Sequence, residues 1–174
     1  MSDAFLSTAW FFLPTFVANQ CPGFAWNLNL PLAKMPVWEK RLGPRKTWGA
    51  YYAGPLGALV VLLFQRQFPE INGKLGLFDY DGKIGIAVLA LGLCPIFGDH
   101  IKSLIKRLPP WKKAPGTHWW PWDQTDFAIA TIAASAVLLT WIGWQRATII
   151  IALVLVYHPI GNEIAYRLGW RDTR

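Results

Sequence analysis

The stretch FGDHIKSLIKR, residues 97–107, combines one carboxylate with three cations. If the stretch is helical, positions spaced i, i+3, i+4, i+7 and i+8 share one face. Those positions hold Asp99, Lys102, Ser103, Lys106 and Arg107. Taken alone, this pattern is explained by a solvated amphipathic helix with an i,i+3 Asp–Lys pair. A second acidic stretch gives the pattern a chemical interpretation.

That stretch, WPWDQTDF at residues 120–127, places Asp123 and Asp126 three residues apart at the expected start of a helix. Asp123 as N-cap and Asp126 in the first turn is a purely structural alternative. Capping does not account for a third carboxylate, Asp99, at the end of the neighbouring apolar segment. Three carboxylates without an equal number of adjacent partners repel one another unless a divalent cation lies among them. Since Mg²⁺ prefers carboxylates together with substrate phosphates, we predict that the three aspartates hold Mg²⁺ and that the nearby cations bind phosphate oxygens.

A basic segment, RLGPRKTWGAYYAG at residues 41–54, is a further candidate for binding an anion. We expect Lys46 and Thr47 to open a helix, where free backbone N–H groups favour an anion. A polybasic anchor at a membrane surface is the alternative. The segment lacks the glycine spacing of a nucleotide-binding P-loop and has no preceding strand, which excludes that class of NTPase.

Catalysis by a nucleophilic triad or by zinc is not supported. The three histidines, at positions 100, 118 and 158, have no placed nucleophile beside them. The only two cysteines, Cys21 and Cys94, are far apart and form no CxxC motif. We interpret both cysteines as small apolar packing residues.

The elements that must position these side chains are apolar enough for a membrane. Hydrophobic residues make up 53% of the 174-residue chain and charged residues only 16%, against about 25% charged in soluble domains. Five apolar segments, 4–18, 47–68, 84–98, 127–144 and 147–160, predict a single all-α, polytopic membrane domain covering residues 1–174. Only the second and fourth reach the roughly 17–25 residues that span a bilayer comfortably. A soluble helical bundle is the alternative.

The distribution of lysine and arginine predicts the orientation of these segments. Loops 19–46 and 99–126 and the C-terminal tail carry thirteen Lys and Arg, and the opposite side carries four. The N-terminus is therefore expected outside and the C-terminus in the cytoplasm. A net charge of +7 in so apolar a chain indicates a membrane surface rather than nucleic acid. Four polar residues then mark cytoplasmic helix ends and a polar cavity on that side: Asn19, Asp99, Asp126 and Asn162.

The depth of Asp99 follows from the length of its segment. A fifteen-residue helix over 84–98 rises only about 22 Å, less than the roughly 30 Å of hydrocarbon. Asp99 is therefore expected below the headgroups, where ionisable groups are costly and usually functional.

The charged motifs resemble those of the CTP:phosphatidate cytidylyltransferases. The matching patterns are Asp99-x-x-Lys102-Ser103-x-x-Lys106-Arg107, Asp123-Gln124-x-Asp126-Phe127, Gly43-x-x-Lys46-Thr47-Trp48-Gly49, Asn19-x-x-Pro22 and His158-x-x-x-Asn162. Together they cover nearly the whole chain and are most similar to the short, five-span CDP-archaeol synthase branch. The resemblance implies that CTP and a phosphorylated dialkyl glycerol lipid give a CDP-lipid and pyrophosphate, with Mg²⁺ as cofactor.

The resemblance also implies roles for individual residues. The residues expected to act in catalysis are Asp99, Lys102, Lys106, Asp123 and Asp126, with the three aspartates as metal ligands. The residues expected to bind substrate are Asn19, Lys46, Thr47, Ser103, Arg107 and Asn162. The expected partners are CTP, a lipid phosphate with isoprenoid or acyl chains, the cell membrane and, as a candidate, a second copy of the chain.

The chain also departs from the longer bacterial enzymes of this family. Gln124 stands where those enzymes have Arg, and His118-Trp119-Trp120 replaces their His-Gly-Gly. These departures favour the archaeol-type branch. Two alternatives remain: a CDP-diacylglycerol synthase acting on phosphatidic acid, and a membrane transporter or anion-binding module that uses the same charged cavity without chemistry.

Overall fold

The computed structural model describes residues 2–114, 117 and 119–167, and this part of the chain is helical without a β-strand. The long helices are α1 (Ser2–Asn27), α3 (Ala50–Arg66), α7 (Trp122–Leu138) and α8 (Trp144–Arg167). A continuous rod is formed by α5 (Ile84–Val88), the π-helical turn η1 (Leu89–Leu93) and α6 (Cys94–Ile105). Two short helices, α2 (Glu39–Leu42) and α4 (Pro69–Leu75), lie in the connections. The predicted all-α class is confirmed for these residues.

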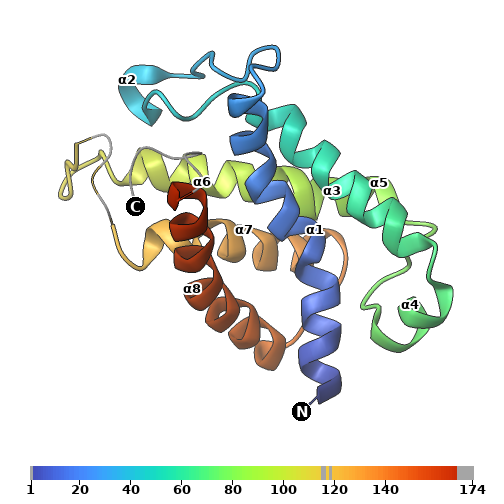
Figure 1. Ribbon diagram of the computed structural model, residues 1–174. Helices are drawn as coiled ribbons and strands as arrows, with labels where there is room; N and C mark the ends of the chain where they lie inside the picture. Colours follow the sequence, from blue (N-terminus) through green and yellow to red (C-terminus); the bar gives the residue numbers. More distant parts are fainter. Residues whose placement is uncertain (1, 115–116, 118, 168–174) are drawn as a thin grey trace.

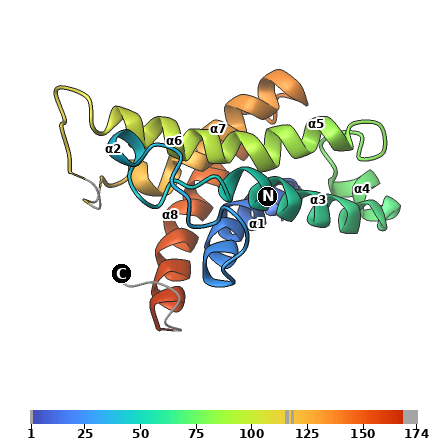
Figure 2. The same cartoon turned by 90° about the horizontal axis from the view of Figure 1, so that it is seen from above.

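The rod of α5, η1 and α6 runs across the molecule, and α1 crosses it (Figures 1 and 2). The π-helical turn ends at Leu93, two residues before Pro95. Proline has no N–H to donate to the carbonyl four residues earlier, so a local change in helix geometry at this point has a physical cause. The rod continues past Gly98 to Ile105, which confirms the expected helix for residues 99–105, while Lys106 and Arg107 follow the helix end.

Several predicted segment ends are wrong, and the fourth segment, predicted to run to residue 144, is helical only to Leu138. Helix α1 continues past Asn19 to Asn27, and Asn162 lies inside α8. Asp99 lies within α6, so a depth calculated from a helix ending at residue 98 does not apply. At Asn19, Asp99 and Asn162 the apolar run ends before the helix does, because polar residues can continue a helix that is already formed.

Thr47 does not open a helix, since α3 begins at Ala50. Thr47 instead forms an isolated antiparallel bridge with Pro36. The bridge is flanked by hydrogen bonds from Val37 N–H to Lys46 O (2.8 Å) and from Trp48 N–H to Met35 O (2.9 Å). The prediction of free helix amides at residues 46 and 47 is therefore wrong: this loop uses its backbone groups to hold itself together.

Small residues let the helices pack closely where they cross. A Cβ at Gly92 in η1 would lie 2.7 Å from Ala58 Cβ and 3.0 Å from Pro55 Cα of α3. A Cβ at Gly57 in α3 would meet Cys21 of α1. Cys21 therefore contributes to packing between α1 and α3, as expected for a small apolar residue. Fully buried side chains of the core come from α1, α3, η1 and α8 and include Phe11, Leu62, Leu91 and Ile150.

Candidate active site

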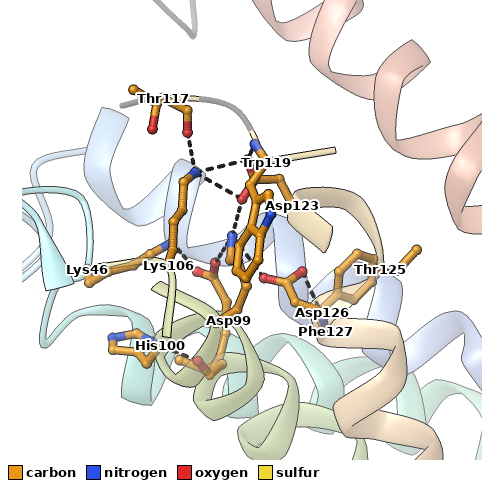
Figure 3. Close-up of polar contacts among 12 residues, drawn as sticks. Lys46, Asp99, His100, Lys106, Thr117, Trp119, Asp123, Thr125, Asp126 and Phe127 are labelled. Atoms are coloured by element: carbon orange, nitrogen blue, oxygen red, sulfur yellow. Dashed lines mark hydrogen bonds and ion pairs between the residues drawn. The ribbon is translucent and has the colours of Figure 1, made fainter. Parts of the chain in front are cut away.

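Three carboxylates and three lysines meet where α6, the start of α7 and the loop before α3 come together (Figure 3). The carboxylates are Asp99 on α6 and Asp123 and Asp126 on α7. The lysines are Lys46 from the loop, Lys102 from α6 and Lys106 immediately after it. Residues far apart in the sequence thus form one polar cluster, called the Asp–Lys cluster below.

Lys102 lies at the centre of the cluster. Its Nζ is 3.3 Å from Asp99 Oδ1, 2.8 Å from Asp123 Oδ1 and 3.1 Å from Asp126 Oδ2. The Lys102 side chain is only 14% exposed, so these ion pairs are shielded from water. Because one ammonium group reaches all three acids, their oxygens lie within about 6 Å of one another. This spacing matches the sequence-based expectation that the three acids share one site.

Asp123 holds two lysines and the loop before α7 in place. It accepts hydrogen bonds from Lys102 (2.8 Å), from Lys106 (3.1 Å) and from the backbone N–H of Trp119. Burial alone would raise the pKa of Asp123, but the hydrogen bond and charge of Lys102, with the Trp119 and Lys106 hydrogen bonds, bring this pKa below its ordinary value. The alternative of Asp123 as N-cap is wrong: α7 begins one residue earlier, with Pro121 at the cap position.

Asp99 and Asp126 point toward each other from α6 and α7, and their carboxyl groups are in contact (Figure 3). Lys46 forms an ion pair with Asp99 across 53 residues of sequence. Asp126 Oδ1 accepts a hydrogen bond from Phe127 N–H (2.8 Å). Its Oδ2, although 3.1 Å from Lys102 Nζ, accepts no hydrogen bond from the described residues. The pair therefore keeps unused acceptor capacity at the centre of the cluster.

By formal charge the cluster pairs three ammonium groups with three carboxyl groups, although burial and the nearby Asp99 raise the pKa of Asp126 to about 7. The sequence-based premise that the carboxylates lack an equal number of adjacent partners is therefore wrong. Among the described residues, no group of three or more His, Cys, Asp or Glu is arranged to hold a metal ion. In this structure the lysines occupy the positions around the carboxylates that a cation would take.

Arg107 lies beside the cluster, over the loop that supplies Lys46. Its guanidinium packs against Gly43, where a Cβ would be 2.5 Å from Nη2. Gly43 has φ of +95°, which favours glycine. Arg107 Nη1 is buried and has no hydrogen-bond partner in the described part of the chain. A buried, unused guanidinium N–H is suited to an anion.

The remaining predicted residues are placed less directly. Ser103 and Thr47 are buried, at 6% and 3% exposed. The described contacts of the cluster include neither Asn19 nor Asn162, which lie within α1 and α8. His100 packs in the rod, with its Nδ1 2.7 Å from Ile96 O, and the ring of His158 lies against Phe127. His118 falls outside the described residues.

Sequence reasoning missed the backbone groups that complete the cluster. The carbonyl of Thr117 accepts a hydrogen bond from Lys106, and the Trp119 N–H donates to Asp123. Neither group has a side-chain signal, so no residue pattern could have identified it. The positive φ position Gly43 could have been suspected from the Gly-Pro turn.

Comparisons with known proteins place the chain among lipid-activating enzymes. Residues 1–174 match the family model described as CarS-like CDP-archaeol synthase. The chain is 30% identical to a CDP-archaeol synthase of Methanocaldococcus jannaschii, over 96% of this chain and 95% of the relative. No solved structure was found to match. The family resemblance that the aspartate and lysine motifs indicated is confirmed.

Proposed function

Because this chain belongs to the CarS-like family of CDP-archaeol synthases, it is a CTP-dependent cytidylyltransferase, and we propose that it activates a phosphorylated dialkyl glycerol lipid at the Asp–Lys cluster. In this reaction a phosphate oxygen of the lipid attacks the α-phosphorus of CTP. A new P–O bond forms, the bond between the α-phosphorus and the bridging oxygen to the β-phosphate breaks, and pyrophosphate leaves. The product is a CDP-lipid.

The single observation that carries this proposal is the meeting of three lysines with three carboxylates at one place. The main obstacle to the reaction is repulsion between the lipid phosphate and the triphosphate. Lys46, Lys102 and Lys106 supply positive charge that can hold phosphate oxygens, and Arg107 adds a partly unused guanidinium. Positioning and charge neutralisation account for most phosphoryl-transfer catalysis.

The reaction does not require a general base from the protein. A phosphate monoester carries a charge of about −1.5 to −2 at neutral pH, because its second pKa is about 6. The nucleophile is therefore already ionised.

We propose Mg²⁺ as the cofactor, held by Asp99 and Asp126 with Asp123 nearby. Two features support the fit: the donors are carboxylate oxygens, and two of the carboxyl groups touch while Asp126 Oδ2 keeps spare acceptor capacity. Lysines that turn to substrate phosphates leave these carboxylates without partners, so a cation is needed in the loaded enzyme. Bound there, Mg²⁺ supplies positive charge to the phosphate oxygens and the leaving group.

We also propose that the protein is embedded in the cell membrane through the five apolar segments, with the cluster on the cytoplasmic side. Two helices, Ile84–Ile105 and Trp144–Ile164, are long and apolar enough to cross a membrane. Only 17% of the apolar window in the second is buried within the protein, unlike the core helix of a soluble bundle. Large apolar side chains such as Val137 (83%) and Trp144 (79%) are exposed. Labelling of single cysteines from each side of sealed vesicles tests the orientation.

Pyrophosphate release by the purified protein tests the proposed activity. We expect release only when CTP, Mg²⁺ and a phosphorylated archaeol lipid are all present, and none in EDTA. An assay in which dialkyl and diacyl glycerol phosphates compete shows which lipid the protein converts faster, and so decides between the archaeol-type substrate and phosphatidic acid. CTP-independent binding of anions without pyrophosphate release would instead favour a transporter, and robust turnover in EDTA would exclude the metal.

A further inference from the structure

We propose that Gly98 is a positioning residue for the Asp–Lys cluster. The absence of a side chain there lets α6 and α7 approach until the carboxyl groups of Asp99 and Asp126 meet. The inference rests on the proposed function in that it takes this pair of carboxylates as the centre of the metal and phosphate site.

The helix crossing at Gly98 is unusually close. A Cβ at this position would lie nearer than 3.0 Å to Ala130 Cβ, a separation that real Cβ atoms essentially never show. The same Cβ would be 3.0 Å from the backbone carbonyl oxygen of Asp126. Ala130 follows Asp126 by four residues, so both lie on the same face of α7. Gly98 therefore contacts the turn of α7 that carries Asp126.

The neighbours of Gly98 explain why this contact matters for the cluster. Asp99 follows it directly in α6, and Lys102 lies one turn further on, between Asp99 and Asp126. A methyl group at position 98 requires the helices to separate by about 1 Å to reach ordinary van der Waals contact. The Cβ of Ala130 is fixed to the backbone of α7, and the carbonyl oxygen of Asp126 is part of that backbone. Neither atom can therefore move aside unless the helix moves. The separation therefore increases the distance between the two carboxylates.

Other glycines of the same rod provide matched controls. Gly92 makes a comparably tight crossing, 2.7 Å from Ala58 Cβ, but against α3, which carries no residue of the cluster. A Cβ at Gly85 would have no neighbour within 4 Å. Glycine inside a helix is less favourable than alanine, so Gly85→Ala reports helix propensity alone. Gly92→Ala reports the effect of an added methyl at a crossing with α3, which carries none of the three carboxylates.

The first experiment moves one methyl group from α7 to α6. It compares the parent protein with Gly98→Ala and with the double variant Gly98→Ala/Ala130→Gly. Activity and the Mg²⁺ concentration needed to stabilise the protein thermally, without CTP, are measured for each. A misplacement of 1 Å can lower a rate about hundredfold, and a misplaced metal ligand can weaken metal binding about tenfold or more. We expect losses of this size in Gly98→Ala and at least partial recovery of both quantities in the double variant.

The control pair is Gly92→Ala and Gly92→Ala/Ala58→Gly. We expect Gly92→Ala to lower the thermal unfolding midpoint while the Mg²⁺ requirement of the folded protein stays unchanged. A Gly98→Ala variant with the same signature, lower stability but an unaltered Mg²⁺ requirement, overturns the positioning role. The positioning role is also overturned if adding Ala130→Gly to the Gly98→Ala variant restores neither activity nor Mg²⁺ binding.

A second measurement needs no ligand and separates this inference from the proposed function. The coupling between Asp99 and Asp126 is obtained from the thermal stabilities of Asp99→Asn, Asp126→Asn and the double variant. We expect clear coupling in the parent, a loss of at least about half in Gly98→Ala, and recovery with Ala130→Gly. Equal coupling in all backgrounds refutes the positioning role. Absence of Mg²⁺ binding and turnover in the parent refutes the proposed function, while the coupling still decides the role of Gly98.

Discussion

Removal of the central ammonium group by Lys102→Met tests the electrostatics of the cluster. Methionine keeps an unbranched, flexible side chain of similar reach but removes the charge. In the variant, Asp99 and Asp126 keep their contact without the lysine that is 3.3 Å and 3.1 Å from them. By formal charge, the cluster changes from three ammonium groups against three carboxyl groups to two against three. We therefore expect a less stable protein that responds more strongly to a divalent cation.

The size of the effect follows from burial. Removing one partner of a buried ion pair costs about 3–5 kcal/mol, and the Lys102 side chain, 14% exposed, places it near the lower end of this range. A loss of about 3 kcal/mol lowers the unfolding midpoint of a chain of this length by about 6–12 °C. A cation present at one hundred times its dissociation constant from the folded protein stabilises that protein by about 2.7 kcal/mol. Saturating Mg²⁺ should therefore restore most of the lost stability.

The assay is thermal unfolding in detergent, followed by tryptophan fluorescence with and without Mg²⁺; the chain has eleven tryptophans. The matched control is Lys74→Met, at an exposed lysine of α4 far from the cluster in sequence. We expect this control to stay near the parent midpoint in both conditions. Two results refute the reasoning: a Lys102→Met midpoint within about 2 °C of the parent, or equal recovery with NaCl at the same ionic strength.

Three further predictions concern neighbouring residues. Asp99→Asn or Asp126→Asn should each lower the rate of CDP-lipid formation about 10²–10³-fold, the usual cost of losing one preorganised electrostatic contact; near-parent turnover of either variant would count against the metal assignment. Lys46→Ala should mainly raise the KM for CTP, because its charge lies beside Asp99 at the edge of the cluster; an unchanged CTP dependence would remove it from the site. Gly43→Ala should displace the guanidinium of Arg107, whose Nη2 would lie 2.5 Å from the added Cβ, and should hold alanine at a strained positive φ. We expect weaker substrate binding, measured as a raised KM. A KM equal to that of the parent protein would contradict this prediction.

Much of the candidate site was predictable because its spacing is a local property. Residues 99 and 102 lie on one face of α6, Lys106 directly follows the end of that helix, and Asp123 and Asp126 share a face of α7 by the same periodicity. The structure places all five in one cluster. The partner of each carboxylate was not predictable. Lys46 reaches Asp99 across 53 residues, and the balance of charge that results could not be counted from the sequence.

The helix ends were the least predictable part of the fold. Hydropathy reports where apolar side chains stop, whereas the backbone hydrogen bonds that define a helix continue through polar residues. Helices α1 and α6 therefore run past Asn19 and Asp99. Thr47 shows the converse, because a bridge to Pro36 uses the residues that an apolar run had suggested for a helix.

The sequence by itself determined the class of the protein and its chemistry: an apolar, helical chain whose aspartate and lysine motifs place it in a cytidylyltransferase family. Only the tertiary structure decided which charges neutralise one another and how closely two helices approach at Gly98. The physical reason is the range of the interactions. Helix periodicity depends on neighbours along the chain, whereas ion pairs and helix crossings depend on side chains that the fold brings together from distant positions.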